Sequence, residues 1–410
     1  MATLIFAGIA WFLFEPSLTK KKNPVTVQTP DLRAKYEELM VARSLAMNTN
    51  FELVIRGGVE WPGLAITKAA KAKWLEHFAS SVKSYRSPDP DAYYILKPNR
   101  KLRRHFAEHP KPDWVRHTNS LGMRGTLEPA EDAPDLRVIV VGDSHIEGVC
   151  RDHETYPAVL GRLLQAEYPE QTIESFNAGV GGYDAYNYLG VLEKHVGLKP
   201  DVFVMTVYGG NDFKGGMVLR DYYTGQAGPR TPVQLKKRIA KSGVELHGFN
   251  PQEIEQAAYF MSFPAQRRRA VEMMVAITDR MQSICSENGI ELICVYLPPP
   301  MRGQPQYYQN EIEKLATALP EFADPLGSSD EVADGWLEFV AERDIELLDL
   351  RPIFAAADEP LYWTTDCHVN LVGQQLIAES IRPRIEAVLV DKQRDGADGQ
   401  MPGSAPESGD

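Results

Sequence analysis

The feature that most constrains the fold is a regular alternation of strand-like and helix-like segments, which begins at Leu136 and runs almost to the C-terminus. Short runs rich in β-branched residues alternate with longer runs of helical periodicity. Such an alternation is typical of βαβ units and predicts a parallel sheet with helices on both faces. The strand-like runs are residues 138–141, 172–176, 202–207, 290–297 and 345–348, and the helix-like runs are 156–168, 185–196, 270–288, 332–343 and 371–389.

Five strands predict an α/β fold, a flavodoxin-like three-layer sandwich with a parallel five-stranded sheet. The strand order 2-1-3-4-5 suits this fold, although periodicity alone does not fix the order. We expect this domain to span residues 131–391. Its long polar insertion, residues 213–265, follows the carboxyl end of a strand and is expected to form a lid. Residues 392–410 contain too few apolar side chains to fold.

The part of the chain before this domain carries weaker patterns, and we expect an N-terminal accessory region over residues 23–130. It contains helix-like segments at 32–47 and 66–82 and a strand-like segment at 93–97. Residues 1–22 are treated separately because Ala2 to Phe14 form an apolar run. This run is short for a membrane span, which needs about 20 residues. We interpret it as a truncated membrane anchor; a misassigned start and an interfacial segment are the alternatives.

The anchor predicts a membrane-associated protein whose body is extracytoplasmic. The basic run Lys20–Lys22 points the other way, because the positive-inside rule would keep the body in the cytoplasm, and that location stays open. The net charge of −12 argues against a nucleic-acid partner. The four cysteines form no CxxC pair, so we expect neither a metal site nor a disulfide framework, and most should be small buried side chains. The sequence leaves the oligomeric state open.

The first strand of the alternation ends in an unusual turn. Residues 138–148 read VIVVGDSHIEG, in which glycine allows a sharp turn and Ser144 stands just beyond it. In open α/β sheets, ligands bind at the carboxyl ends of the strands. The alternative is a plain strand-to-helix connection in which Asp143 or Ser144 caps the helix.

Other strand ends carry polar residues that complete a chemical set. The second strand is followed by NAGVGGYDA (177–185), the third ends in VYGGNDF (207–213), and TTDCHVNLVGQQ (364–375) precedes the last helix. A serine hydrolase needs a serine, a histidine base, a carboxylate that orients the base, and donors for the oxyanion. The sequence places all of these at one edge of the predicted sheet.

These four blocks together resemble those of the SGNH (GDSL-type) hydrolase family, over about residues 136–389. GDSH at Gly142–His145 is similar to its serine block, NAGVGG to its glycine block, GGND to its asparagine block and DCHVN to its histidine block. The resemblance implies a catalytic triad and an oxyanion hole. The triad would consist of Ser144, His368 and Asp366, and the oxyanion donors would come from Ser144, Gly182 and Asn211.

The chain departs from the family pattern in the last block. The usual spacing is Asp-x-x-His, whereas here it is Asp-x-His, and Thr365 stands where the aspartate usually lies. The shorter spacing also occurs in family relatives that transfer acetyl groups to polysaccharides. Upstream, NSLGMRG (119–125) resembles a segment of many bacterial members, to which we assign no chemistry.

The resemblance implies a serine esterase that hydrolyses an O-acyl ester, with acetyl as the expected group, through an acyl-enzyme and without a cofactor. The substrate would be a small-molecule or carbohydrate ester. Two alternatives stay open: a polysaccharide O-acetyltransferase, and a non-catalytic carbohydrate-binding protein on the same fold. We expect His145 to line the pocket rather than act as a second base, and Asp143 to order the turn by hydrogen bonds.

Overall fold

The computed structural model describes residues 53–56, 59–62, 85–224, 228–244, 250–343 and 345–398. The apolar segment 2–14 and the helices expected at 32–47 and 66–82 lie outside the described residues, as do residues 399–410. In the part of the chain that the structure describes, no helix combines the length and the apolar character needed to cross a bilayer.

A parallel five-stranded sheet forms the centre of the molecule, as the alternation predicted. Its order is β11-β10-β9-β7-β8, which equals 2-1-3-4-5 when the five strands are numbered along the chain. The neighbouring strands all pair in parallel, and β7 and β9 are buried throughout, which explains their nearly continuous apolar sequences. The strands are β7 (Leu136–Val141), β8 (Ile173–Asn177), β9 (Val202–Tyr208), β10 (Glu291–Leu297) and β11 (Glu346–Asp349).

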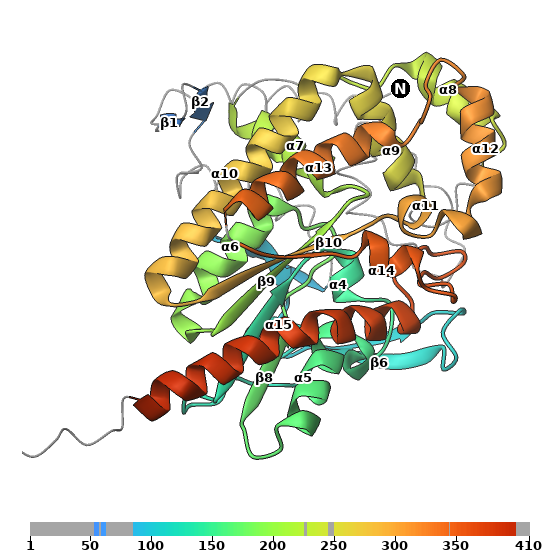
Figure 1. Cartoon of the computed structure of the whole chain (residues 1–410). Coiled ribbons are helices and arrows are strands. Elements are labelled where there is room, and N and C mark those ends of the chain that lie inside the picture. Colours follow the sequence, from blue (N-terminus) through green and yellow to red (C-terminus); the bar gives the residue numbers. More distant parts are fainter. Residues whose placement is uncertain are drawn as a thin grey trace, which may run out of the picture.

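Helices cover both faces of this sheet (Figure 1). Because side chains alternate along a strand, Val138 and Val140 of β7 join one core, and Ile139 and Val141 join the other. The first core packs against α5 (Tyr156–Glu167) and α15 (Leu371–Asp398). The second core packs against α6 (Ala185–His195), α10 (Pro264–Asn288) and α13 (Gly327–Glu342).

The last helix is longer than the sequence indicated. We expected the fold to end at Asp391, but α15 continues to Asp398. Its extension is polar, and polar contacts hold it: Lys392 Nζ lies 2.7 Å from Asp201 Oδ1 and 2.8 Å from the carbonyl of Asp135. The domain boundary that we predicted from low apolar content, at Asp391, is therefore too early.

The insertion at 213–265 does not stand apart as the expected lid. Its described residues form α7 (Asp212–Thr224), α8 (Val233–Lys241) and α9 (Asn250–Ser262). Phe213 and Met217 of α7 lie in the same core as α6 and α10. Apolar residues of α8 and α9 form a third cluster with α11 (Pro300–Gly303) and α12 (Gln309–Ala318). The insertion thus extends the helical layer, because its helices have apolar faces of their own.

The accessory region consists of short antiparallel hairpins in its described part. They are β1 (Leu53–Arg56) with β2 (Val59–Pro62), β3 (Arg86–Asp89) with β4 (Tyr93–Leu96), and β5 (Lys101–His105) with β6 (Asp113–His117). The strand expected at 93–97 is confirmed as β4. The β3–β4 hairpin docks on α6, where Asn187 donates a hydrogen bond to the carbonyl of Ala92 and Lys194 pairs with Asp89.

Candidate active site

The turn after β7 presents Ser144 at the carboxyl end of an interior strand, which lies between β9 and β8. Only glycine fits at position 142, because a Cβ there would lie 2.2 Å from Cγ1 of Ile146. Asp143 Oδ1 accepts a 2.8 Å hydrogen bond from the backbone N–H of His145, so Asp143 orders this turn as expected. Ser144 then begins the short helix α4 (Ser144–Glu147) and is partly exposed.

Asp366 and His368, which the sequence predicts as a pair, are in contact in the structure. Nδ1 of His368 lies 2.5 Å from Oδ1 of Asp366, which also accepts a 3.3 Å hydrogen bond from the His368 backbone N–H. The residue between them, Cys367, has a φ of 66°, in the left-handed region. This tight turn brings the two side chains together across one intervening residue, which accounts for the short spacing of the block.

The carboxyl group of Asp366 is held in its charged form. Burial works against the charge, but His368 and its hydrogen bonds, together with Arg104, keep the pKa of Asp366 below its ordinary value. The His368 side chain is 2% exposed and that of Asp366 is 21% exposed. A charged carboxylate on Nδ1 fixes the imidazole tautomer that leaves Nε2 able to accept a proton.

His145 links the serine turn to this pair. Its ring centroid lies 4.6 Å from that of His368 and 3.9 Å from that of Tyr208. Its Nδ1 accepts a hydrogen bond from the backbone N–H of Val369, and its carbonyl accepts one from Gln374 of α15. Burial, reinforced by the charge of His368, lowers the pKa of His145 well below its ordinary value. A neutral imidazole packed between two other rings fits a residue that lines the pocket better than it fits a second base.

The glycine block lies against Ser144. A Cβ on Gly181 would lie 3.4 Å from Cβ of Ser144, so the peptide at this position passes directly beside the serine. The Gly181 N–H donates a 2.5 Å hydrogen bond to Oε2 of Glu147, and its carbonyl accepts hydrogen bonds from Arg86 and Tyr94. Gly182 follows with a φ of 80°, a backbone conformation that favours glycine.

Asn211 occupies the turn between β9 and α7. Its carbonyl accepts a hydrogen bond from the N–H of Gly215, and its side-chain oxygen is buried without a hydrogen-bond partner among the described residues. The next residue, Asp212, accepts hydrogen bonds from the Tyr188 hydroxyl (2.6 Å) and the Tyr208 N–H (2.7 Å). Burial, together with the nearby Asp143, raises the pKa of Asp212 well above its ordinary value.

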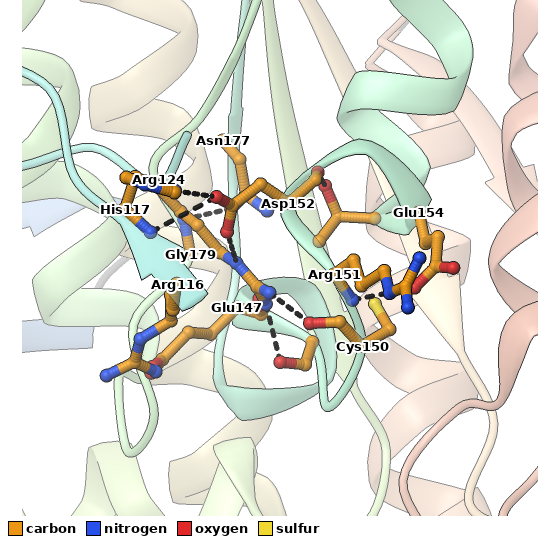
Figure 2. Close-up of polar contacts among 12 residues, drawn as sticks. Arg116, His117, Arg124, Glu147, Cys150, Arg151, Asp152, Glu154, Asn177 and Gly179 are labelled. Atoms are coloured by element: carbon orange, nitrogen blue, oxygen red, sulfur yellow. Dashed lines mark hydrogen bonds and ion pairs between the residues drawn. The ribbon is translucent and has the colours of Figure 1, made fainter. Parts of the chain in front are cut away.

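Sequence reasoning missed the charged residues that brace the end of α4. Figure 2 shows Arg124 reaching the carbonyls of Glu147, Gly148 and Cys150, while its Nε lies 3.3 Å from Asp152. Arg116 forms a buried ion pair with the carboxylate of Glu147. Burial alone would raise the pKa of Glu147, but Arg116 and Arg86 lower it to about 2. The family-like segment NSLGMRG contained the signal, since its arginine is Arg124.

The structure also places the four cysteines and Thr365. All four cysteines are free and buried, which confirms that they act as small buried side chains. Thr365, at the usual position of the aspartate, does not contribute to the pair: its N–H and its hydroxyl donate to Glu108 of the accessory region. Within the described ranges, no cluster of three or more His, Cys, Asp or Glu side chains could hold a metal ion.

Comparison with known proteins gives one strong match. The model of a family described as GDSL-like lipase/acylhydrolase matches residues 140–376, more than half of the chain and all four blocks. No curated protein matches the sequence. Solved structures that are similar include a catalytic mutant of an acetylxylan esterase from Geobacillus stearothermophilus, with 13% identity, a TM-score of 0.37 and coverage of 62% of this chain and 96% of that one. An α/β hydrolase enzyme from the metagenome of Lake Arreo has 17% identity, a TM-score of 0.35 and coverage of 61% and 95%.

Proposed function

The chain belongs to the GDSL-like lipase/acylhydrolase family, and from that premise we propose that it is a serine esterase that cleaves an O-acyl ester through an acyl-enzyme on Ser144. The family relationship makes the chain a hydrolase of carboxylic ester bonds. The observation that carries the proposal is the 2.5 Å contact between His368 and Asp366, on a loop that packs against the residue next to Ser144.

In the proposed first step, His368 Nε2 takes the proton of the Ser144 hydroxyl while Oγ attacks the ester carbonyl. The Asp366 carboxylate holds Nδ1–H and stabilises the imidazolium that forms. The backbone N–H groups of Ser144 and Gly182 and the side-chain amide of Asn211 donate to the oxyanion. Each such donor is typically worth about 2.7–4 kcal/mol of barrier.

The tetrahedral intermediate then collapses. The bond to the leaving alcohol breaks, His368 returns its proton to the alkoxide, and the acyl group stays on Ser144 Oγ. In the second step His368 takes a proton from water, the hydroxide attacks the acyl carbonyl, and the acid leaves as Ser144 regains its proton. Every proton and electron pair in this sequence is supplied by the ester, water and the three side chains.

We propose an acetyl ester of a carbohydrate as the substrate. The support is the Asp366-x-His368 spacing, since this spacing also occurs in family relatives that transfer acetyl groups to polysaccharides. The same spacing favours one alternative, in which a sugar hydroxyl replaces water in the second step. The near-complete burial of His368 is compatible with this alternative, because it limits the access of water to the base.

The test is turnover of p-nitrophenyl acetate by the wild-type protein and by Ser144→Ala, followed by mass analysis of the products formed with an added oligosaccharide. We expect the wild type to release acetate and the variant to be inactive while keeping its circular-dichroism spectrum. Full activity in Ser144→Ala would exclude the serine esterase. Transfer of acetyl to the oligosaccharide at the expense of free acetate would assign the transferase instead.

A further inference from the structure

We propose that Glu108, in the connection of the β5–β6 hairpin, is a positioning residue that holds Asp366 in place for His368. The inference rests on the proposed function, because it assigns the Asp366–His368 pair its catalytic role. It gives the accessory region a part in positioning a catalytic pair of the domain that follows it in the chain.

Three hydrogen bonds carry the inference. Oε2 of Glu108 accepts the backbone N–H of Thr365 at 3.0 Å, and Oε1 accepts the backbone N–H of Asp366, also at 3.0 Å. The Thr365 hydroxyl donates to Oε1 as well. One carboxylate therefore binds both consecutive N–H groups that lead into Asp366. Hydrogen bonds to a charged acceptor are roughly twice as strong as neutral ones.

The turn that Glu108 grips needs support from outside. Cys367 adopts a left-handed conformation, which costs about 1–2 kcal/mol for a residue other than glycine. The shortened spacing depends on this conformation. The left-handed turn at Cys367 directs Oδ1 of Asp366 back toward the backbone nitrogen and Nδ1 of His368. Strained backbone persists only where the surroundings hold it. Glu108 supplies such a constraint through the backbone N–H groups of Thr365 and Asp366.

The connection that carries Glu108 is itself fixed to the domain. The next residue, His109, has a buried side chain whose Nε2 lies 2.9 Å from Oε2 of Glu154. Phe106 packs edge-on against Trp363, with ring centroids 5.3 Å apart. Glu108 is therefore anchored on both sides along its own chain, and its carboxylate can transmit that rigidity to Asp366.

The effect of replacing Glu108 depends on the charged groups around the Asp366–His368 pair. Arg104 of β5 acts on Asp366, and His368 faces Asp143 and His145 of the serine turn. Glu108→Gln keeps the shape of the side chain but removes its charge and turns one oxygen into an NH₂ donor. That donor would face an N–H group, so at least one of the three hydrogen bonds is lost and the Asp366 turn loosens.

The experiment compares wild type, Glu108→Gln and the matched control Asp113→Asn. Asp113 is an exposed carboxylate on the same hairpin, and it contacts His105 instead of the turn. The direct readout is the downfield NMR resonance of the His368 Nδ1 proton, assigned by its loss in His368→Ala. The second readout is kcat and KM for p-nitrophenyl acetate.

We expect Glu108→Gln to shift the Nδ1 resonance upfield and to lower kcat by about 10- to 100-fold with KM unchanged within twofold, as for small misplacements of catalytic groups. Asp113→Asn should match the wild type in both readouts. Thr365→Val removes only the hydroxyl contact and should give a smaller change in the same direction. This variant replaces Glu108→Gln in the experiment if Glu108→Gln does not fold.

An unchanged resonance and kcat in folded Glu108→Gln would overturn the proposal, and so would a raised KM with unchanged kcat. If the wild type hydrolyses no ester while the resonance still moves in Glu108→Gln, the proposed function fails and the positioning contact stands. The two ideas are therefore separable in one set of samples.

Discussion

Asp366 reaches His368 across a single residue because Cys367 takes a left-handed backbone conformation between them. The carboxylate meets Nδ1, which leaves Nε2 as the proton acceptor. The His145 ring lies tilted against the His368 ring and stays neutral because burial lowers its pKa, so it adds no repelling charge when the imidazolium forms. At the scale of residues, the roles of base, orienting carboxylate and supporting ring are thus distinct.

These roles predict a hierarchy of losses. His368→Ala removes proton transfer and should lower kcat by about 10⁶-fold, whereas Asp366→Asn leaves the ring in place and should lower it by about 10⁴-fold, as in other serine hydrolases. Steady-state kinetics with a small acetyl ester, on variants checked for folding, measures both. Equal losses would contradict this hierarchy, and a Thr365→Ala variant worse than Asp366→Asn would show that Asp366 is not the orienting carboxylate.

The sequence predicted the residues to which we assign the chemistry and missed the residues that hold them. Ser144, Asp366 and His368 could be predicted because their residue types, order and strand-end positions match a known chemical set. Glu147, Arg116 and Glu108 could not, because each acts through a partner that is distant in the sequence. A buried ion pair leaves no local periodicity, and only the folded structure brings its two halves together.

At the scale of elements, the strands were the most predictable part. The runs at 138–141 and 202–207 lie inside β7 and β9. They could be predicted because strands buried on both faces are nearly continuously apolar. The predicted end of the fold at Asp391 was too early, because α15 continues to Asp398 in a polar extension that apolar content could not indicate. The packing of the insertion was missed because its apolar residues face partners at 300–326.

One buried carboxyl in that insertion gives a pH prediction. Glu253 of α9 is 1% exposed, and burial raises its pKa to about 8, although the N–H of Met301 and the charge of Arg302 oppose the shift. Between the ordinary pKa and 8, the unfolded chain ionises while the folded protein keeps Glu253 neutral. The contribution of this group to stability therefore decreases as pH rises through that window, by at most about 1.4 kcal/mol per pH unit.

Glu253→Gln, which stays neutral, should remove this dependence. We expect its Tm to exceed that of the wild type by a margin that grows from pH 5 to pH 8 and then levels off. Thermal denaturation at intervals of one pH unit measures the margin. Glu255→Gln changes a more exposed carboxylate on the same helix and should leave the profile unchanged. A constant margin for Glu253→Gln would contradict a buried neutral carboxyl.

At the scale of the whole molecule, the accessory region supports three of the four turns that build the site. Arg86 and Tyr94 hold the carbonyl of Gly181, Arg116 pairs with Glu147 at the end of the serine turn, and Glu108 binds the turn of Asp366. The region that carried the weakest sequence patterns thus contributes much of the rigidity around the site.

The buried ion pair gives a prediction at this scale. Glu147→Ala should lower the free energy of unfolding by about 3–5 kcal/mol, because Arg116 is left buried without its partner. The double variant with Arg116→Leu should lose less than the sum of the two single variants, since the pair acts as a unit. Urea denaturation measures all three. Glu321→Gln, in an exposed pair with Arg238, is the control and should change little. Additive losses would show that the two residues act independently.

The most direct test of the central claim is to locate the covalent adduct. Diethyl p-nitrophenyl phosphate phosphorylates the activated serine of serine esterases, and peptide mass mapping identifies the modified residue. We predict one diethylphosphoryl group on the peptide that contains Ser144, formed in step with the loss of esterase activity and absent in Ser144→Ala and His368→Ala. An adduct on another residue, or full inactivation without modification of Ser144, would contradict the assignment of Ser144 as the nucleophile.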